Sequence, residues 1–355
     1  MGQKITTTQF YLYGKKHFTQ TGWRNALQRC PPEGGLLGAT TDLTGHTFVV
    51  TGANSGIGKE LAQFLSSKKA KVYMVCRNRE RAEKARDEIA AENGEGAGPL
   101  EIVVSDVATK AGVEGVVKSL ANEDKLDGLV CNAGALSDKV KLTEDGVETT
   151  FGCHLLFGSY LLAKLAKPLL DKAKEPRVIF VSSGGMYNTK FPAWDVVTAT
   201  KPGLKFNGQL AYAYCKRGQV LLAERLTEQH AGTSPIKYVS CHPGWVDTPG
   251  VDAAYGSQKK YLEPMRTPWQ GTDGIAWLCI APGDKVKGGE FYLDREPQTK
   301  HLSGYFMSEG KFTKNTAEEV DQMMANLEAW ADKPVPHPDA QPDGAAAAAP
   351  AAQAK

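Results

Sequence analysis

The 355-residue chain lacks the features that would tie it to nucleic acid, a structural metal or a membrane span. Its net charge is only +2 and it has no dense basic run, which argues against nucleic acid as a partner. Its seven cysteines include no Cys-x-x-Cys pair and are odd in number, so neither a disulfide framework nor a zinc site is indicated. No apolar run could cross a bilayer, and residues 3–28 lack the apolar core of a secretory signal. These absences predict an intracellular protein, cytoplasmic or peripheral to a membrane.

The N-terminal extension, residues 1–43, carries two features that bear on membranes. Gly2 followed by Thr6 fits the loose pattern for N-myristoylation, but such short patterns often match by chance, and the alternative is an ordinary polar start. One acyl chain gives only weak membrane association without a second signal. Spaced aromatic and basic residues, among them Phe10 and Lys15, indicate an amphipathic helix. Such a helix would lie on the rest of the chain or on a membrane, and packing on its own domain is the commoner outcome.

Residues 44–310 alternate short apolar runs with helix-length segments. The runs are Thr47–Thr51, Lys71–Cys76, Glu101–Val104, Gly128–Cys131, Arg177–Val181 and Ile236–Cys241, with a last strand near Glu290–Leu293. This alternation predicts one α/β domain with a Rossmann-type, doubly wound parallel sheet and helices on both faces. A C-terminal helix is expected within residues 311–332, over 316–332. The Pro- and Ala-rich residues 333–355 predict a disordered tail.

A glycine-rich loop joins the first strand to the first helix of this domain. The loop runs Thr51, Gly52, Ala53, Asn54, Ser55, Gly56, Ile57, Gly58. Strand, glycine loop and helix in this order are the context of a dinucleotide site: Gly52 permits a tight turn, Gly56 lets the backbone approach a pyrophosphate, and Gly58 lets helix and strand pack closely. The N–H groups of the helix N-terminus then face the phosphates.

The residues after the second strand indicate which dinucleotide binds. An NAD(H) site would place a carboxylate there for the ribose hydroxyls, but this chain has Arg77, with Arg79 and Arg81 nearby. A guanidinium can form a forked pair with a 2′-phosphate, so NADP(H) is favoured over NAD(H). The alternative is a solvated basic start to the next helix.

The loop resembles the T-G-x-x-x-G-I-G loop of the short-chain dehydrogenase/reductase family, and a Tyr-x-x-x-Lys pair supports the resemblance. That spacing occurs four times and is weak by itself. Only Tyr212 and Lys216 lie between the strands that end at Val181 and Cys241, where the family places its pair. At i and i+4 on a helix the two side chains share a face, so the ammonium would stabilise a phenolate at Tyr212.

The resemblance implies an oxidoreductase that transfers hydride between a nicotinamide and a small, lipophilic carbonyl or alcohol substrate. It assigns Ser183 to the substrate oxygen, although a Ser at a strand end can also act as a cap. It implies cofactor contacts at Asp106, Val107, Asn132, Ala133, Gly134, Pro243, Gly244, Val246 and Thr248, with Asp106 at the adenine unless it simply caps the next helix. Homo-oligomers are usual in the family. Aromatic residues in segments 186–210 and 249–268 are expected to rim the substrate pocket.

One departure from the family pattern concerns the helix after the fourth strand. The family has an Asn there, which completes an Asn-Ser-Tyr-Lys set through a bound water, but His154 takes that position here. Counting back from Tyr160 and Pro168 shifts the register by one residue, which indicates a small insertion. His154 would either hold the same water or be an ordinary polar residue facing a groove. The departure leaves an alternative open: an NADP(H)-binding protein with little catalysis, acting as a structural or sensing subunit.

Overall fold

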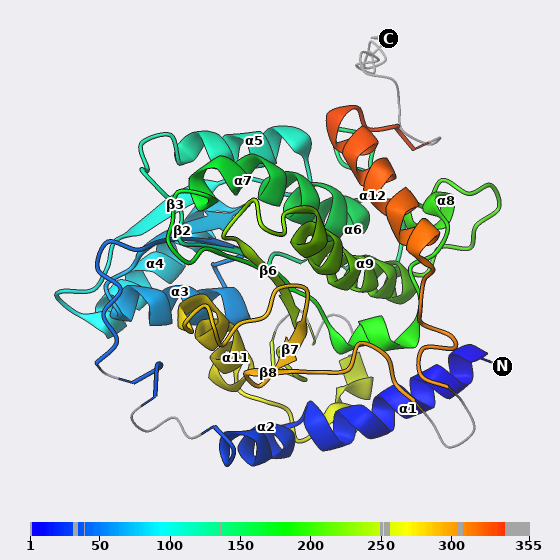
Figure 1. Cartoon of the computed structure of the whole chain (residues 1–355), viewed down its shortest axis with the longest axis horizontal. Coiled ribbons are helices and arrows are strands. Elements are labelled where there is room, and N and C mark those ends of the chain that lie inside the picture. Colours follow the sequence, from blue (N-terminus) through cyan, green and yellow to red (C-terminus); the bar gives the residue numbers. More distant parts are fainter. Residues whose placement is uncertain are drawn as a thin grey trace, which may run out of the picture.

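The computed structural model describes residues 2–30, 35–38, 40–134, 136–248, 251, 256–303 and 308–337. Within them lies one eight-stranded sheet in the order β3-β2-β1-β4-β5-β6-β7-β8 (Figure 1). The strands are β1 Thr47–Thr51, β2 Lys71–Cys76, β3 Leu100–Val104, β4 Gly128–Cys131, β5 Arg177–Val181, β6 Lys237–Cys241, β7 Phe291–Leu293 and β8 Glu296–Pro297. The first seven pair in parallel, and β8 pairs antiparallel with β7 at the edge. The predicted doubly wound α/β fold is confirmed.

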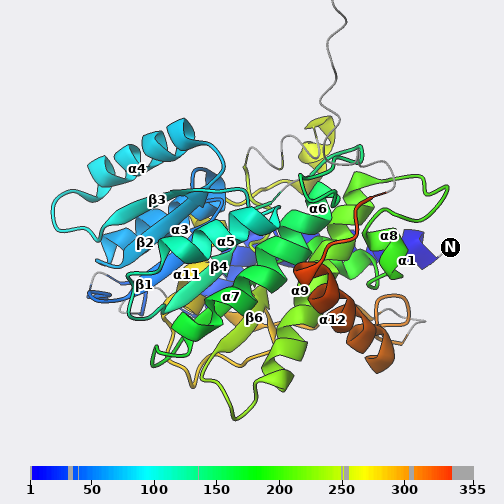
Figure 2. The same cartoon turned by 90° about the horizontal axis from the view of Figure 1, so that it is seen from above.

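Helices cover both faces because alternate residues of each strand point to opposite sides. Val49 joins the core on one face, while Phe48 and Val50 join the core on the other. The first face carries α5 Lys110–Ser119, α6 Thr149–Phe151, η1 Gly152–Leu161, α7 Leu162–Leu170 and α9 Gly208–Gln229. The second carries α3 Gly56–Ser67, α4 Arg79–Asn93 and α11 Pro268–Ile280 (Figures 1 and 2). The short helices η2 Gly184–Asn188, α8 Trp194–Val197 and η3 Gly256–Leu262 lie in connections.

The strand order creates a crevice between β1 and β4. From β1 the chain winds outward to β2 and β3, and then returns to β4 on the other side of β1. Open α/β sheets bind ligands outside the carboxyl ends of their strands at such a switch of direction. The glycine loop follows β1, and Asn132 follows β4, so both lie at this crevice.

The N-terminal extension packs against the domain through α1 Gly2–His17 and α2 Gln20–Leu27, as Figure 1 shows along the lower edge of the molecule. Phe18 is buried against Tyr187 and Trp245. Gly14 lies so close to Trp245 that a Cβ there would come within 2.4 Å of its ring. The sequence allowed this helix to lie on its own domain or on a membrane, and in the structure it lies on its own domain.

Buried Arg266 ties the extension to the domain. Its guanidinium donates to the carbonyl oxygens of His17 at 2.8 Å and Phe18 at 3.0 Å, and it pairs bidentately with Asp294 at 2.6 and 2.9 Å. It also reaches the carbonyl oxygen of Pro243 at 3.3 Å. A buried arginine with this many acceptors fixes several chain segments at once.

The C-terminal part folds back onto α9 and η1. The predicted helix is α12 Ala317–Asp332, which begins with a capping box between Thr316 and Glu319. The disordered tail predicted from residue 333 does not begin there. The backbone N–H of His337 donates to Gly146 at 2.7 Å, and its Nε2 lies 2.8 Å from the carbonyl oxygen of Ala199. These two contacts hold residues 333–337 to the domain, and the rest of the predicted tail, 338–355, lies outside the described residues.

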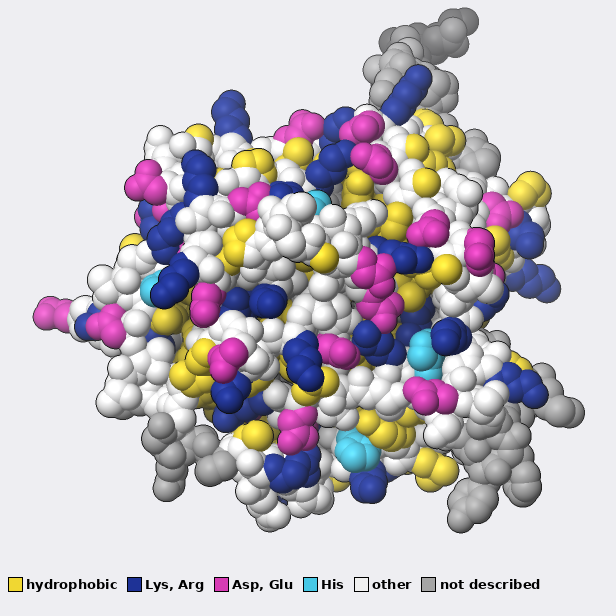
Figure 3. All heavy atoms as spheres, viewed as in Figure 1, with side chains coloured by type: hydrophobic (Ala, Val, Ile, Leu, Met, Phe, Trp, Pro, Cys, Tyr) yellow, Lys and Arg dark blue, Asp and Glu magenta, His cyan; other side chains and the backbone are white. Residues whose placement is uncertain are grey.

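Positively charged Lys and Arg and negatively charged Asp and Glu are interspersed on the face shown in Figure 3, with apolar side chains between them. This mixture agrees with the near-neutral charge of the chain. Among the helices that the structure describes, none is both long enough and apolar enough to span a membrane.

Candidate active site

The glycine loop builds a cradle for phosphates at the end of β1. Gly52 and Gly56 have φ values of +69° and +52°, which residues with a Cβ rarely adopt. A Cβ at Gly58 would lie 2.3 Å from the carbonyl oxygen of Gly52, so helix α3 can approach the strand only with glycine there. The N-terminus of α3 opens into a cleft of about 320 Å³. The cleft is lined by Gly52, Asn54, Ser55, Gly56, Ile57, Val75, Cys76, Arg77, Arg81, Ser105, Asp106, Val107, Asn132, Ala133, Gly134, Cys153 and Thr248.

Thr51 and Gly58 support this cleft from behind and do not line it. The fully buried Thr51 hydroxyl accepts the backbone N–H groups of Asn132 at 3.0 Å and Ala133 at 2.9 Å. The Asn132 side chain donates to the carbonyl oxygen of Thr51 at 2.9 Å. These bonds clamp the ends of β1 and β4 together, so Thr51 holds the loop that carries the cleft. Gly58 has the close helix–strand packing expected of it, and cofactor binding at both residues stays a prediction.

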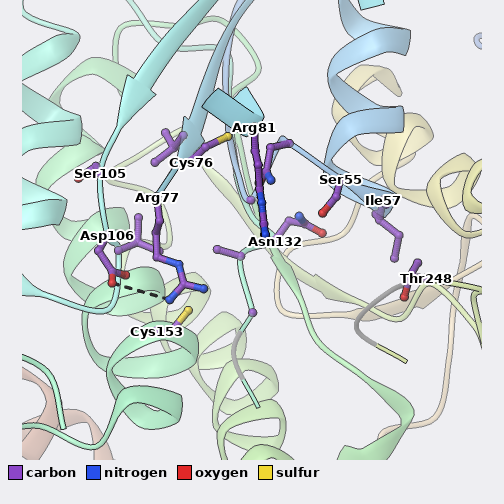
Figure 4. A pocket seen from close by; sticks show the side chains of 17 residues that line it. Ser55, Ile57, Cys76, Arg77, Arg81, Ser105, Asp106, Asn132, Cys153 and Thr248 are labelled. Atoms are coloured by element: carbon purple, nitrogen blue, oxygen red, sulfur yellow. Dashed lines mark ion pairs between the residues drawn. The ribbon is translucent and has the colours of Figure 1, made fainter. Parts of the chain in front are cut away.

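Two arginines face the cleft at the end of β2 (Figure 4). Arg77 Nη1 lies 3.9 Å from Asp106 Oδ2 in an exposed ion pair, and Arg81 extends from the first turn of α4 toward Asn132. Asp106 does not cap the next helix: Thr109 is the N-cap of α5, and Asp106 accepts the N–H of Ala108 at 3.0 Å. The cleft therefore offers two guanidinium groups and one carboxylate at the strand ends.

A second cavity of about 340 Å³ adjoins the cleft and shares Ile57, Asn132, Gly134 and Thr248 with it. All four predicted catalytic residues line it: His154, Ser183, Tyr212 and Lys216. Pro243, Gly244, Val246 and Thr248 form another part of its wall. A ligand that extends from the cleft past Gly134 would thus reach the Tyr–Lys pair.

Tyr212 and Lys216 occupy one face of α9, as their spacing predicts. Lys216 Nζ lies 5.3 Å from the centroid of the Tyr212 ring. The ammonium donates to the carbonyl oxygen of Val181 at 2.7 Å and to Gln219 Oε1 at 3.1 Å. Burial lowers the pKa of Lys216 to about 8. Lys216 is therefore an ammonium group whose charge is lost just above neutral pH.

Ser183 combines the two interpretations that its position allowed. Its Oγ accepts the N–H of Gly185 at 3.2 Å as the N-cap of η2, and the same side chain faces the cavity. Accepting one N–H leaves the hydroxyl proton able to donate. Ser182, by contrast, is turned inward and donates to the carbonyl oxygen of Lys216 at 2.8 Å.

The helix after β4 is widened at the place where the register shift indicated a small insertion. Between α6 and α7, residues Gly152–Leu161 form a π-helix, in which each turn holds an extra residue. His154 lies in this widened segment, is buried, and meets the Tyr212 ring edge-on at 5.1 Å between ring centroids. Its backbone carbonyl accepts from Ser159 Oγ at 2.6 Å and Gln219 Nε2 at 2.9 Å.

The cavity has further walls. Asn188 and Gln209 come from segment 186–210, and Val251 and Leu262 come from segment 249–268, the two segments expected at the rim. The residues that sequence reasoning missed are Phe10, Leu136, His242 and Trp245. Burial lowers the pKa of the His242 imidazole well below its usual range, so this ring is neutral. The aromatic residues expected to form a rim in segment 186–210 do not: Phe191 is in the core and Trp194 packs on Phe151 and Trp330. Only the position of His242, directly before Pro243, offered a sequence signal.

A phosphate cradle at the switch point of a parallel sheet, next to a cavity with a Tyr–Lys pair, defines a dinucleotide-dependent oxidoreductase of the α/β class. The model of the short chain dehydrogenase family matches residues 46–258. The chain belongs to this family, whose members are NAD(P)-dependent oxidoreductases that act on CH–OH and C=O groups of small molecules.

The relatives agree with this assignment. Human dehydrogenase/reductase SDR family member 12 is 36% identical over 295 residues, 82% of this chain and 89% of that protein. Human retinol dehydrogenase 12 is 34% identical over 266 residues, 74% of this chain and 81% of that protein. Among solved structures, an uncharacterised protein from Mycobacterium paratuberculosis superposes with a TM-score of 0.62 at 22% identity, covering 82% of this chain and 95% of its own. L-sorbose reductase from Gluconobacter frateurii, complexed with NADPH and L-sorbose, gives 0.56 at 20%, covering 71% and 95%.

Proposed function

We propose that this protein interconverts a lipophilic carbonyl compound and its alcohol with NADP(H) as the cofactor. One observation carries the proposal: Ser183, Tyr212 and Lys216 line a cavity that shares four wall residues with a cleft bearing Arg77 and Arg81. The residues that follow β2 directly, Arg77 and Asn78, include no carboxylate for ribose hydroxyls, so the local charge favours a 2′-phosphate. Human retinol dehydrogenase 12 and the NADPH complex above point in the same direction.

The cleft fits a dinucleotide because Gly52 and Gly56, which line it, carry no side chain that would fill it, and because it opens on the N-terminus of α3. When bound, the nicotinamide supplies or accepts the hydride. In the reductive direction, the Tyr212 hydroxyl donates a proton to the carbonyl oxygen while the Ser183 hydroxyl orients that oxygen with a hydrogen bond. The Lys216 ammonium stabilises the phenolate left behind.

The cavity wall supports an apolar substrate with one polar oxygen. Phe10, Leu136, Trp245, Val251 and Leu262 contribute apolar surface around the polar groups of Ser183 and Tyr212. Acylation of Gly2, weak membrane association and homo-oligomers stay predictions for this protein.

The proposal is tested by measuring NADPH oxidation with a panel of aliphatic and aromatic aldehydes and ketones, together with NADPH binding by fluorescence. The expected result is turnover that is larger for apolar substrates. Tyr212→Phe should lower kcat by at least about a hundredfold, since general acid catalysis is worth roughly 10²–10⁴-fold, with NADPH affinity nearly unchanged. Tyr214→Phe, on the same helix and outside the cavity, is the control. NADPH binding without turnover on any substrate contradicts the proposal, and so does full activity in Tyr212→Phe.

A further inference from the structure

A buried hydrogen-bond network lies behind Lys216. Two of the three N–H groups of its ammonium are used by acceptors fixed in the core, the carbonyl oxygen of Val181 and Gln219 Oε1. Val181 is the last residue of β5, and Gln219 lies one turn beyond Lys216 on α9. Because Lys216 also lines the cavity, these two acceptors orient the remaining N–H toward the reacting groups.

The Gln219 amide is itself held in one orientation. Its Nε2 donates to the carbonyl oxygen of His154 at 2.9 Å and to Ser159 Oγ at 3.0 Å. The Ser159 hydroxyl donates to the same carbonyl oxygen at 2.6 Å, so Ser159 Oγ can only accept from the amide. An ammonium cannot accept a hydrogen bond, so the amide oxygen must face Lys216 and the amide nitrogen must face η1. The side chain has no second orientation that satisfies these partners.

The partner of this amide is the backbone of the π-helix. The carbonyl oxygen of His154 accepts from the Ser159 hydroxyl within η1 and from the Gln219 amide on α9. Gln219 and Ser159 are each only 1% exposed. The network thus connects the backbone of η1 at His154 to the catalytic ammonium through the Gln219 side chain.

We propose that Gln219 is the positioning residue of this site, which holds the Lys216 ammonium toward Tyr212 through the carbonyl oxygen of His154. The proposal rests on the function proposed above for the Tyr–Lys pair. The sequence suggested that a water molecule held by His154 supports Lys216. In this proposal the side-chain amide of Gln219 supports it. The amide oxygen favours the charged form of Lys216 and so opposes the effect of burial. The alternative is that Gln219 is an ordinary buried residue, which packs in the core and does not affect the ammonium of Lys216.

The test measures the proton affinity of Lys216 without cofactor or substrate. The free energy of unfolding is measured in urea from pH 6 to 10.5 for the wild type and for Lys216→Met. Because the pKa of Lys216 is about 8 in the fold and about 10.4 in the unfolded chain, the native protein releases the proton first. The wild type should therefore gain stability relative to Lys216→Met as the pH rises from about 8 to about 10.4. The lower edge of this window reports the native pKa of Lys216.

The comparison between Lys216 and Lys216→Met is then repeated in two variants that change only residue 219, whose side chain accepts from the ammonium. Gln219→Leu removes a hydrogen bond to a charged group and should move the lower edge down by about one pH unit or more. Gln219→Glu places a carboxylate beside the ammonium and should move the edge up. Gln229→Leu, the same change at an exposed position of α9, should leave the edge where it is. If Gln219→Leu does not fold, Ser159→Ala, which removes one acceptor of the amide, should move the edge down by a smaller amount.

Loss of stability in both Gln219 variants without any movement of the edge would overturn the proposal, because a space-filling role predicts that outcome. Turnover provides a second readout. Gln219→Leu should lower kcat by about tenfold or more and leave the KM for NADPH unchanged. If the edge moves but the wild type shows no turnover, the proposed function fails and the positioning role stands. If Tyr212→Phe abolishes turnover but the Gln219 variants leave the lower edge of the pH window unchanged, the proposed function stands and the positioning role fails.

Discussion

Arg77, Arg79 and Arg81 follow one another closely in the sequence, but they face different surroundings. Arg77 and Arg81 line the cofactor cleft, whereas Arg79 lies outside it and pairs with Glu83 at 3.5 Å on the exposed side of α4. Figure 4 shows the Arg77 guanidinium turned toward Asp106 across the cleft. A 2′-phosphate at this end of the cleft would therefore share Arg77 with Asp106.

Arg77→Asp should weaken NADPH binding by roughly 10- to 100-fold, since a hydrogen bond to a charged group contributes about 1.5–3 kcal/mol. NADH binding should change far less, because NADH lacks the 2′-phosphate. The dissociation constants are measured by fluorescence titration at two salt concentrations, and the NADPH effect should shrink at high salt. Arg79→Asp is the matched control and should affect neither cofactor. Equal losses for NADPH and NADH in Arg77→Asp would contradict the NADP(H) preference.

Single residues could be predicted where they end a strand or follow a glycine loop. Ser183, Tyr212 and Lys216 were found through their order between β5 and β6, and they do line one cavity. Gln219 could not be found in this way, because a glutamine one turn after a lysine has no distinctive pattern. Its importance comes from a contact with His154, 65 residues away, that only the packed helices create.

Helix α1 is the element with the clearest link to substrate choice. It packs against η2 and Trp245, and through Phe10 it forms part of the cavity wall. The extension is therefore part of the site, although the family model begins only at residue 46. Relatives without such a helix would leave this side of the cavity open.

Phe10→Ala should raise the KM for an apolar substrate by about tenfold, because the variant loses apolar contact of the order of 1.5–3 kcal/mol. The value of kcat and the affinity for NADPH should change little, since Phe10 does not line the cofactor cleft and carries no group that takes part in proton transfer. Steady-state kinetics with one long and one short aldehyde measures the effect, and the long one should be affected more. Leu12→Ala, at a 64% exposed position of the same helix, should behave as the wild type. An unchanged KM in Phe10→Ala would remove α1 from the substrate site.

Strands were the most predictable elements. Four of the seven expected strands have the predicted ends, and β3, β6 and β7 differ by one residue at their starts. Buried parallel strands are continuous apolar runs bounded by turns, so their limits are visible in the sequence. The widening of η1 was indicated only by a shift of register, because its contact with α9, from Gln219 to the carbonyl oxygen of His154, joins residues far apart in the sequence.

At the scale of the whole molecule, α12 closes an apolar face formed by η1 and α9. Val320, Met323, Met324 and Leu327 are buried there, whereas the ion pairs that flank them, such as Lys164 with Glu328, are exposed and contribute little. The helix was predictable from its apolar spacing, but the surface that it covers was not.

A truncation after residue 315 should lower the free energy of unfolding by about 5 kcal/mol or more, since burying each such side chain contributes about 1.5–3 kcal/mol. The exposed face should also cause self-association. Urea unfolding and light scattering after size-exclusion chromatography measure the two effects. A truncation after His337 keeps α12 and should match the full chain. A stable, monodisperse protein without α12 would show that this face needs no cover.

The bonds from Arg266 to residues 17 and 18 have a consequence for synthesis on the ribosome. Helix α1 is made first, but Trp245, Arg266 and Asp294, which it needs, are made more than 220 residues later. At usual elongation rates the helix waits on the order of tens of seconds for them. During that interval its aromatic side chains have no native surface to cover. The substrate cavity is therefore among the last parts of the protein to be completed, and folding of the nascent chain should slow if its C-terminal third is withheld.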